Sequence, residues 1–316
     1  MLKRNNAWVT SHVPFPASLW ESFNNRPKMF SRTTQFIPLC TQVRGMATLK
    51  EIRMRLKSVT NIQKITKSMK MVSAAKYARA EKELKVARPY GKGAQAFYEK
   101  VATKGEDKGT NQLYIAFTSD RGLCGGVHSS VVKAVKAEML NKDNTNTKLI
   151  LIGDKAKTML QKIYGKNVLM SFNDIGKKPP SFGDATVIAQ NILNSDFKFD
   201  NATVFYNVFR TVVAYKTTGM PVHSTETISR SEKLGQYDSI DEDVLKSYNE
   251  FQLSSLIFYA LKESATSEQS SRMTAMEGAS KNAGEMIGKL TLTFNRTRQA
   301  VITRELIEII SGASAL

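Results

Sequence analysis

The chain lacks any long apolar stretch, and it is poor in cysteine, histidine and tryptophan. Its longest uninterrupted apolar run, residues 256–261, is six residues long, whereas a membrane-spanning helix needs about 20. The 316 residues include two Cys, three His and two Trp, and no Cys or His cluster has the spacing of a metal site. The sequence therefore predicts no membrane span, no bound metal and no cofactor.

Acidic residues are almost missing from the first 46 positions, which hold six Lys or Arg and one acid, Glu21. Residues 29–46 contain no acid at all but two Arg and several hydroxyl side chains. This composition predicts a mitochondrial transit peptide over residues 1–46, cleaved before Ala47; a disordered cytosolic tail is the alternative. Residues 1–28 fit the composition of a transit peptide less well. Met29 is therefore an alternative start of the natural protein, in which case residues 1–28 would be a non-native extension.

Proline and glycine are absent from residues 47–88. Apolar residues there recur every three or four positions, which predicts a helix over 47–90. We expect Pro89 and Gly91 to end it. The predicted apolar stripe comprises Leu49, Ile52, Leu56, Val59, Ile62, Ile65, Met69 and Val72.

No proline occurs after Pro221, and acidic residues 241–243 suit the first turn of a helix. A seven-residue repeat follows, with the spacing of a coiled coil. Two long helices, 47–90 and 226–316, can bury their stripes most simply against each other, as an antiparallel coiled coil. The repeat places Met273, Ser280, Ile287, Phe294 and Val301 on one row and Met276, Ala283, Leu290 and Thr297 on the other.

The middle of the chain, residues 91–225, alternates strand-like and helix-like segments. This alternation predicts an inserted, Rossmann-like α/β domain with a mostly parallel sheet. Strands are expected at 112–120, 147–153, 167–172, 202–209 and 211–215, and helices at 127–140, 154–164 and 185–193.

A glycine-rich turn, SDRGLCGG, spans residues 119–126 between a strand and a helix. It lacks the Lys-Ser/Thr pair of a phosphate-binding loop and the glycine spacing of a dinucleotide site, so a tight connection is expected. Cys124 would need a histidine partner to act as a nucleophile; His128 is better explained as a surface or capping residue, and His223 stands alone. The sequence therefore predicts no catalytic residue.

Positive charge is the strongest remaining signal. Net charge is +18, and residues 47–90 alone hold twelve Lys or Arg against three acids. A nucleic-acid strand usually requires stacking aromatics, and a membrane-surface helix requires Trp or Phe on its apolar face; this helix has Tyr77 and Tyr90 only. An acidic protein surface is the favoured partner. The end of the chain, 302–316, is apolar on several sides, which indicates that something encloses it.

Four segments make the chain resemble the γ subunits of F-type ATP synthases: ITRELIEIISGASA (302–315), residues 47–91, SDRGLCGG, and SEQSSRMTAMEGASKNA. The resemblance covers essentially all of 47–316. It implies a non-catalytic rotor shaft, peripheral to the mitochondrial inner membrane on its matrix side. Its implied partners are a ring of α and β subunits around the coiled coil, and the δ and ε subunits and the ring of c subunits at the foot. A mitochondrial nucleic-acid-binding coiled coil is the alternative.

The resemblance also implies which residues meet the α/β ring. Met69 and Lys70, with Arg272 on the opposing helix, match positions that face an acidic loop of the β subunit. Arg298 and Gln299 match positions that meet another β-subunit loop. Ile309 and Ile310 belong to the tip that turns inside a sleeve lined by α and β.

Overall fold

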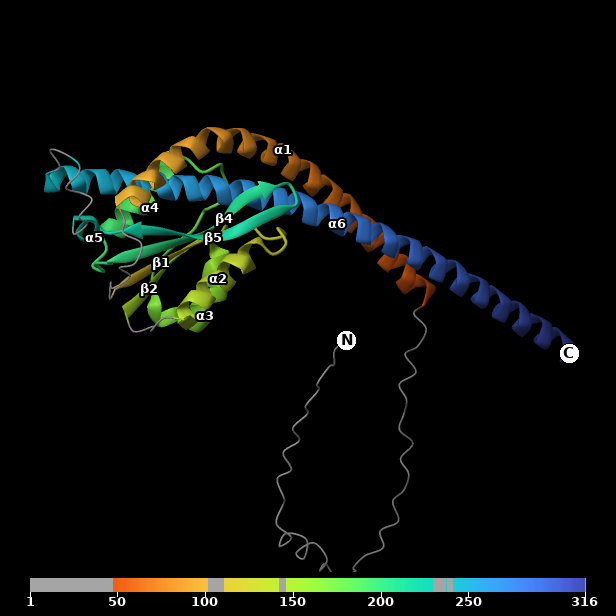
Figure 1. The fold of residues 1–316 in the computed structure, drawn as a ribbon. Coiled ribbons are helices and arrows are strands. Elements are labelled where there is room, and N and C mark those ends of the chain that lie inside the picture. The colour runs from red at the N-terminus through yellow and green to blue at the C-terminus, as the bar shows by residue number, and fades with distance from the viewer. Residues whose placement is uncertain (1–47, 102–110, 142–145, 230–236, 238–240, 316) are drawn as a thin grey trace, which may run out of the picture. The chain divides into compact units, whose positions relative to one another are not determined.

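A computed structural model describes residues 48–101, 111–141, 146–229, 237 and 241–315 of the chain. The expected transit peptide lies outside the described residues. Residues 47–316 form one compact unit, which is built from two long helices and a five-stranded sheet (Figure 1).

The first long helix, α1, runs from Leu49 to Val101. It begins with a capping box, in which the Thr48 N–H donates to Glu51 and the Glu51 N–H donates to the Thr48 hydroxyl. The expected end at Pro89 and Gly91 is wrong, because the helix continues through both. Gly91 serves close packing instead: a Cβ there would lie 2.3 Å from Cγ of Tyr259. Tertiary packing thus outweighs the local helix-breaking tendency.

The second long helix, α6, runs without a break from Glu242 to Ser314, 73 residues, or about 110 Å. Both predicted heptad rows are confirmed as its packing face. Met276 and Ala283 are buried and the other seven members are half-buried, while almost all of the residues between them from position 285 onward are exposed. Helix α1 packs along this face, which confirms the coiled coil (Figure 1).

The predicted stripe of α1 is only half right. Ile52 and Val59 are buried, but Ile62, Ile65 and Val72 are 49%, 58% and 57% exposed. The stripe averaged about 3.3 residues per step, whereas a coiled-coil seam needs 3.5, so the apolar row turns away from the partner helix. Beyond Val59 the seam instead runs through small or polar residues: Gln63, Thr66, Lys70 and Ser73.

The foot between the two helices is built on a sheet in the order β3-β2-β1-β4-β5. The first four strands are parallel, and β5 forms an antiparallel hairpin with β4, so the mostly parallel sheet is confirmed. The strands are β1 Gln112–Phe117, β2 Thr147–Ile152, β3 Val168–Phe172, β4 Asn201–Thr211 and β5 Ala214–His223. The helices of the foot are α2 Val127–Asn141, α3 Asp154–Tyr164, η4 Gly165–Asn167, α4 Phe182–Leu193 and α5 Thr225–Ser229.

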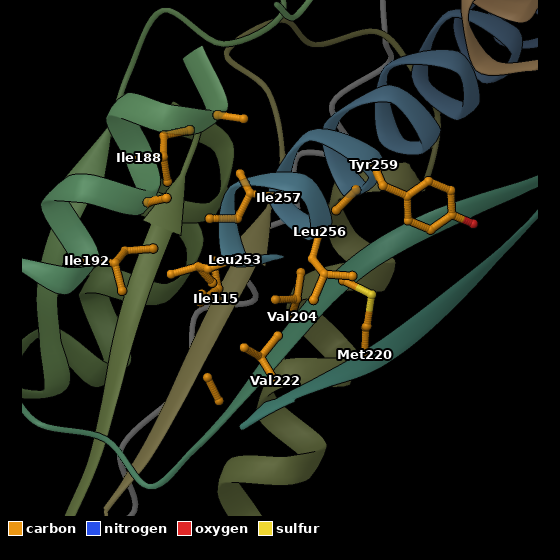
Figure 2. Close-up of a cluster of buried hydrophobic side chains, with 14 of the residues drawn as sticks. Ile115, Ile188, Ile192, Val204, Met220, Val222, Leu253, Leu256, Ile257 and Tyr259 are labelled. Atoms are coloured by element: carbon orange, nitrogen blue, oxygen red, sulfur yellow. The ribbon is translucent and has the colours of Figure 1, made fainter. Parts of the chain in front are cut away.

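Two apolar layers cover the sheet. Helices α2 and α3 pack on one face through residues such as Val131, Val135 and Leu160. Helix α4 and the first part of α6 pack on the other face, where Ile188 meets Leu253 and Ile257 (Figure 2). Helix α6 therefore belongs both to the core of the foot and to the coiled coil.

Candidate partner-contact surface

Met69 and Lys70 lie half-buried on α1, where the coiled coil leaves the foot. The Lys70 ammonium donates to the Glu277 carboxylate on α6 at 2.7 Å. The two side chains are 39% and 61% exposed, and an ion pair this open contributes at most about 1 kcal/mol. Lys70 is therefore an accessible cation that a stronger anionic surface could engage.

Arg272 lies inside the chain rather than on its surface, with 5% of its area exposed. Its guanidinium donates from Nη2 to Glu268 and from Nε to the Gly122 carbonyl at 3.2 Å. This arrangement ties α6 to the glycine-rich turn. The side chain fixes the turn against the helix, and its contact with a partner stays a prediction.

Arg298 and Gln299 are exposed on α6. Ile309 and Ile310 are 68% and 65% exposed. Every described residue of α6 beyond Val301 is exposed. Helix α1 begins at Leu49, beside the segment of α6 where Arg53 stacks over the Phe294 ring, so it does not cover the part of α6 that follows. The tip of α6 is thus a single helix with apolar side chains on several sides, as expected for a segment that a partner encloses.

Most cations of α1 are free to meet a partner. Of the twelve Lys and Arg between residues 47 and 90, ion pairs within the described residues involve Lys70, Lys85 and Arg88. The other nine of these Lys and Arg side chains have no carboxylate partner within the described residues. They form a long basic surface on a helix that also exposes apolar side chains.

The sequence prediction missed the outward apolar face of α1. Ile62, Ile65, Met71 and Val72 are each about half exposed or more. A signal for it was present, since stepping by seven from Ile52 through Val59 and Thr66 to Ser73 marks the true seam and leaves these residues outside it. Basic and apolar side chains therefore share one outer surface, which fits a protein partner better than a polyanion alone.

The glycine-rich turn is a structural connection, as expected. Cys124 is 2% exposed, and burial raises the pKa of its thiol to about 11, so little reactive thiolate forms at neutral pH. A surface position for His128 is wrong, because its side chain is buried; its ring bonds to the Arg121 carbonyl at 3.0 Å rather than to the thiol. Among the described residues, no group of His, Cys, Asp or Glu could hold a metal ion.

Comparison with known proteins identifies the family of this chain. The ATP synthase family model matches residues 48–316. The mitochondrial ATP synthase subunit gamma of Drosophila melanogaster is 58% identical over 296 residues, covering 91% of this chain and 99% of the relative. The chain belongs to the ATP synthase gamma family. The rat mitochondrial subunit gamma of the F(1) complex is 57% identical, over 85% of this chain and all of the relative.

The gamma subunit is the non-catalytic central-stalk subunit of the rotary ATP synthase. The central stalk of the Tetrahymena thermophila mitochondrial enzyme superimposes with a TM-score of 0.59 at 27% identity, over 68% of this chain and 99% of that one. A Euglena gracilis mitochondrial ATP synthase chain shares the fold, with a TM-score of 0.72 at 21% identity over 84% of this chain and 94% of that one. No helix among the described residues is long and apolar enough to cross a membrane.

Proposed function

We propose that the coiled coil turns inside a ring of α and β subunits while the foot stands with the δ and ε subunits on the ring of c subunits. One observation carries this proposal: a long helix pair bears unpaired cations and outward apolar side chains along its length and ends in an exposed apolar tip. A surface of this kind on an isolated chain indicates partners on several sides.

Within this arrangement we assign distinct contacts to the two ends of the shaft. Met69 and Lys70, near the foot, would pass an acidic loop of each β subunit, and Arg272 would support that region from within. Arg298 and Gln299 would meet another loop of the β subunits, and Ile309 and Ile310 would turn within the sleeve. The half-exposed Lys70–Glu277 pair supports this assignment, because a weak pair can be exchanged for a passing carboxylate at small cost.

We further propose that the protein acts on the matrix side of the mitochondrial inner membrane, held there by its partners. The mitochondrial names of the relatives support this location. The family match begins at residue 48, which is compatible with removal of a transit peptide before Ala47. Import of a chain starting at Met29, followed by sequencing of its mature N-terminus, tests the processing.

Affinity purification of the tagged chain from mitochondria tests the proposed function. We expect α and β subunits to be recovered with this chain, together with the δ, ε and c subunits, and ATP hydrolysis that drives proton pumping after reconstitution. A matched variant, Ile309→Asp with Ile310→Asp, should assemble less well because it places charge on the apolar tip. Recovery of RNA or DNA without α and β subunits would overturn the proposal.

A further inference from the structure

Helix α6 contacts the foot through two successive segments of different chemistry. The first, residues 253–261, is mostly apolar and packs on the sheet (Figure 2). The second, residues 263–274, is mostly polar and yet is deeply buried, with Glu263, Ser267 and Ser270 only 0%, 1% and 2% exposed. Burying a polar side chain stabilises a fold less than burying an apolar one, so the stability of the foot alone does not explain why this segment is polar.

Three side chains of the polar segment bond to the backbone of the β4–β5 hairpin. They follow one another at intervals of four and three residues, which places them on one face of α6. The bonds are those of the Glu263 carboxylate from the Phe209 N–H at 2.8 Å, of the Ser267 hydroxyl to the Asn207 carbonyl at 3.0 Å, and of the Ser270 hydroxyl to the Val212 carbonyl.

Two more side chains bond to the backbone of the glycine-rich turn. Ser271 donates to the Cys124 carbonyl at 2.8 Å, and Arg272 donates from Nε to the Gly122 carbonyl at 3.2 Å. The turn follows β1, whereas the hairpin is formed by β4 and β5, so two separate parts of the foot hold this segment of α6. In all five bonds the foot contributes a backbone atom, whose position is fixed by the strand or turn that contains it.

Bonds of this kind restrict motions that apolar packing leaves comparatively free. Hydrophobic contact is non-directional, so an apolar helix face resists separation from a sheet more than it resists turning or sliding on it. A hydrogen bond weakens steeply when its geometry is disturbed. Ser270 and Ser271 point in directions about 100° apart on the helix, toward the hairpin and the turn respectively. The bonds therefore resist both rotation of α6 about its own axis and sliding along that axis.

The function proposed above requires this resistance, because a foot and a shaft that rotate together need a joint that does not turn. We propose that the polar segment 263–274 is the torque-bearing joint of the protein. Its five bonds to the foot hold the angular register of the shaft, and Ser267 and Ser271 act as positioning residues within it. This inference rests on the proposed function and names the residues through which torque passes between its two parts.

Angular fluctuations of the foot in the assembled enzyme test the proposal. The α/β head is fixed to a surface, and a gold particle attached through Leu140→Cys, an exposed position of the foot, is followed in the absence of ATP. Ser267→Ala with Ser271→Ala removes two of the five bonds without adding volume. We expect the variance of the angle to rise roughly 1.2- to 1.7-fold, the upper value being that for two bonds lost from five that share the load equally. The lower value allows for the compliance of the helices, which adds in series.

Ser254→Ala with Ser264→Ala is the matched control on the same helix. This pair also removes one buried and one half-buried hydroxyl. Ser254 donates to the Glu250 carbonyl within α6, and the Ser264 hydroxyl has no hydrogen-bond partner among the described residues. The variance should therefore equal that of the wild-type chain.

Ser271→Ala and Ser271→Thr form a second comparison, which keeps the test informative if the double variant does not assemble. The alanine should widen the fluctuation, whereas the threonine keeps a hydroxyl and should leave it at the wild-type value. Urea unfolding of each chain measures stability separately, and a lower free energy of unfolding with unchanged variance would reduce the bonds to a structural role.

Two kinds of failure are distinguishable. ATP-driven rotation of the wild-type foot together with equal variance in the two double variants would overturn this inference alone. Equal widening by Ser271→Ala and Ser271→Thr would also overturn it. Absence of rotation of the wild-type foot on an active α/β head would overturn the proposed function, and this inference with it.

Discussion

Arg88 of α1 and Glu263 of α6 form an ion pair whose carboxylate has no exposed surface, with Nε of Arg88 2.8 Å from Oε1 of Glu263. The same carboxylate accepts from the Phe209 N–H at 2.8 Å and from the Tyr259 hydroxyl at 3.2 Å. Arg88 also donates to the Phe209 carbonyl. One side chain thus joins both long helices to β4, at the junction of foot and coiled coil.

We expect Glu263→Ala to lower the free energy of unfolding by about 3–5 kcal/mol, because it leaves a guanidinium and a backbone N–H without their buried acceptor. Urea unfolding of the full chain followed by circular dichroism measures this. Glu277→Ala is the matched control, because it removes an exposed partner and should cost below about 1 kcal/mol. Equal losses in the two variants would show that burial of Glu263 is unimportant.

Gly91 and Gly93 provide a matched pair within α1. Gly91→Ala should destabilise the chain by about 1–3 kcal/mol, because its Cβ would overlap the ring of Tyr259. Gly93 has open space around the same position, so Gly93→Ala should stabilise the helix by about 0.5–1 kcal/mol. Thermal unfolding compares the two. A shift of the same sign in both variants would contradict the close approach of α1 to α6.

Met69→Lys should uncouple the enzyme, with ATP hydrolysis retained and proton pumping lost. The new ammonium adds an attraction to passing carboxylates and is partly desolvated beside the seam. Lys70→Gln should change little, because it removes one exposed pair with Glu277. Hydrolysis and pumping measured together in membrane vesicles decide the point. Equal loss of both activities in Met69→Lys, or strong uncoupling by Lys70→Gln, would count against weak, exchangeable contacts.

Removal of the residues after Glu308 deletes Ile309, Ile310 and the final six residues. We expect weaker assembly and reduced turnover without complete loss, since the seam between the helices remains intact. Unfolding of the isolated chain should be unchanged, because the deleted residues that the structure describes are exposed. Native gel electrophoresis and ATP hydrolysis check this. A complex of normal composition but no activity would instead mean that the tip itself transmits torque.

Cys124 should resist alkylation in the folded chain. Burial raises the pKa of its thiol to about 11, so the thiolate fraction at pH 8 is far below that of a free cysteine. Labelling with iodoacetamide should be slow, should accelerate in denaturant, and should rise with pH towards 11. ATP hydrolysis of the assembled enzyme should not respond to a thiol reductant. Rapid labelling at pH 8, or a reductant effect abolished by Cys124→Ser, would contradict these expectations.

Strand and helix alternation in the foot could be predicted from sequence because each element buries one face against its neighbours. The expected helices at 127–140 and 154–164 match α2 and α3 to within one residue. The expected strand at 211–215 was misplaced, because it covers the end of β4, the hairpin turn and only the first two residues of β5, which extends from Ala214 to His223. Pairing of β5 along the whole of β4 supplies the hydrogen bonds that its own sequence, with Gly219 and Pro221, does not suggest.

The long helices were harder to predict, because their partners determine their faces. Pro89 and Gly91 end a helix only where tertiary packing does not outweigh local backbone preferences. Here the buried residues Leu84, Ala87 and Tyr98 hold α1 in its helical path on both sides of them. The outward position of Ile62 could not follow from a rule that places apolar residues inside. Such an outward apolar face is the kind of surface that a partner would cover.

Helix α6 extends without a break from the core of the foot to the tip of the coiled coil. The foot and the shaft consequently share one continuous ladder of backbone hydrogen bonds, with no hinge loop between them. A rotation applied to the foot cannot be lost in a flexible joint along α6. The compliance of this rotor must therefore come from elastic twisting and bending of the helices themselves.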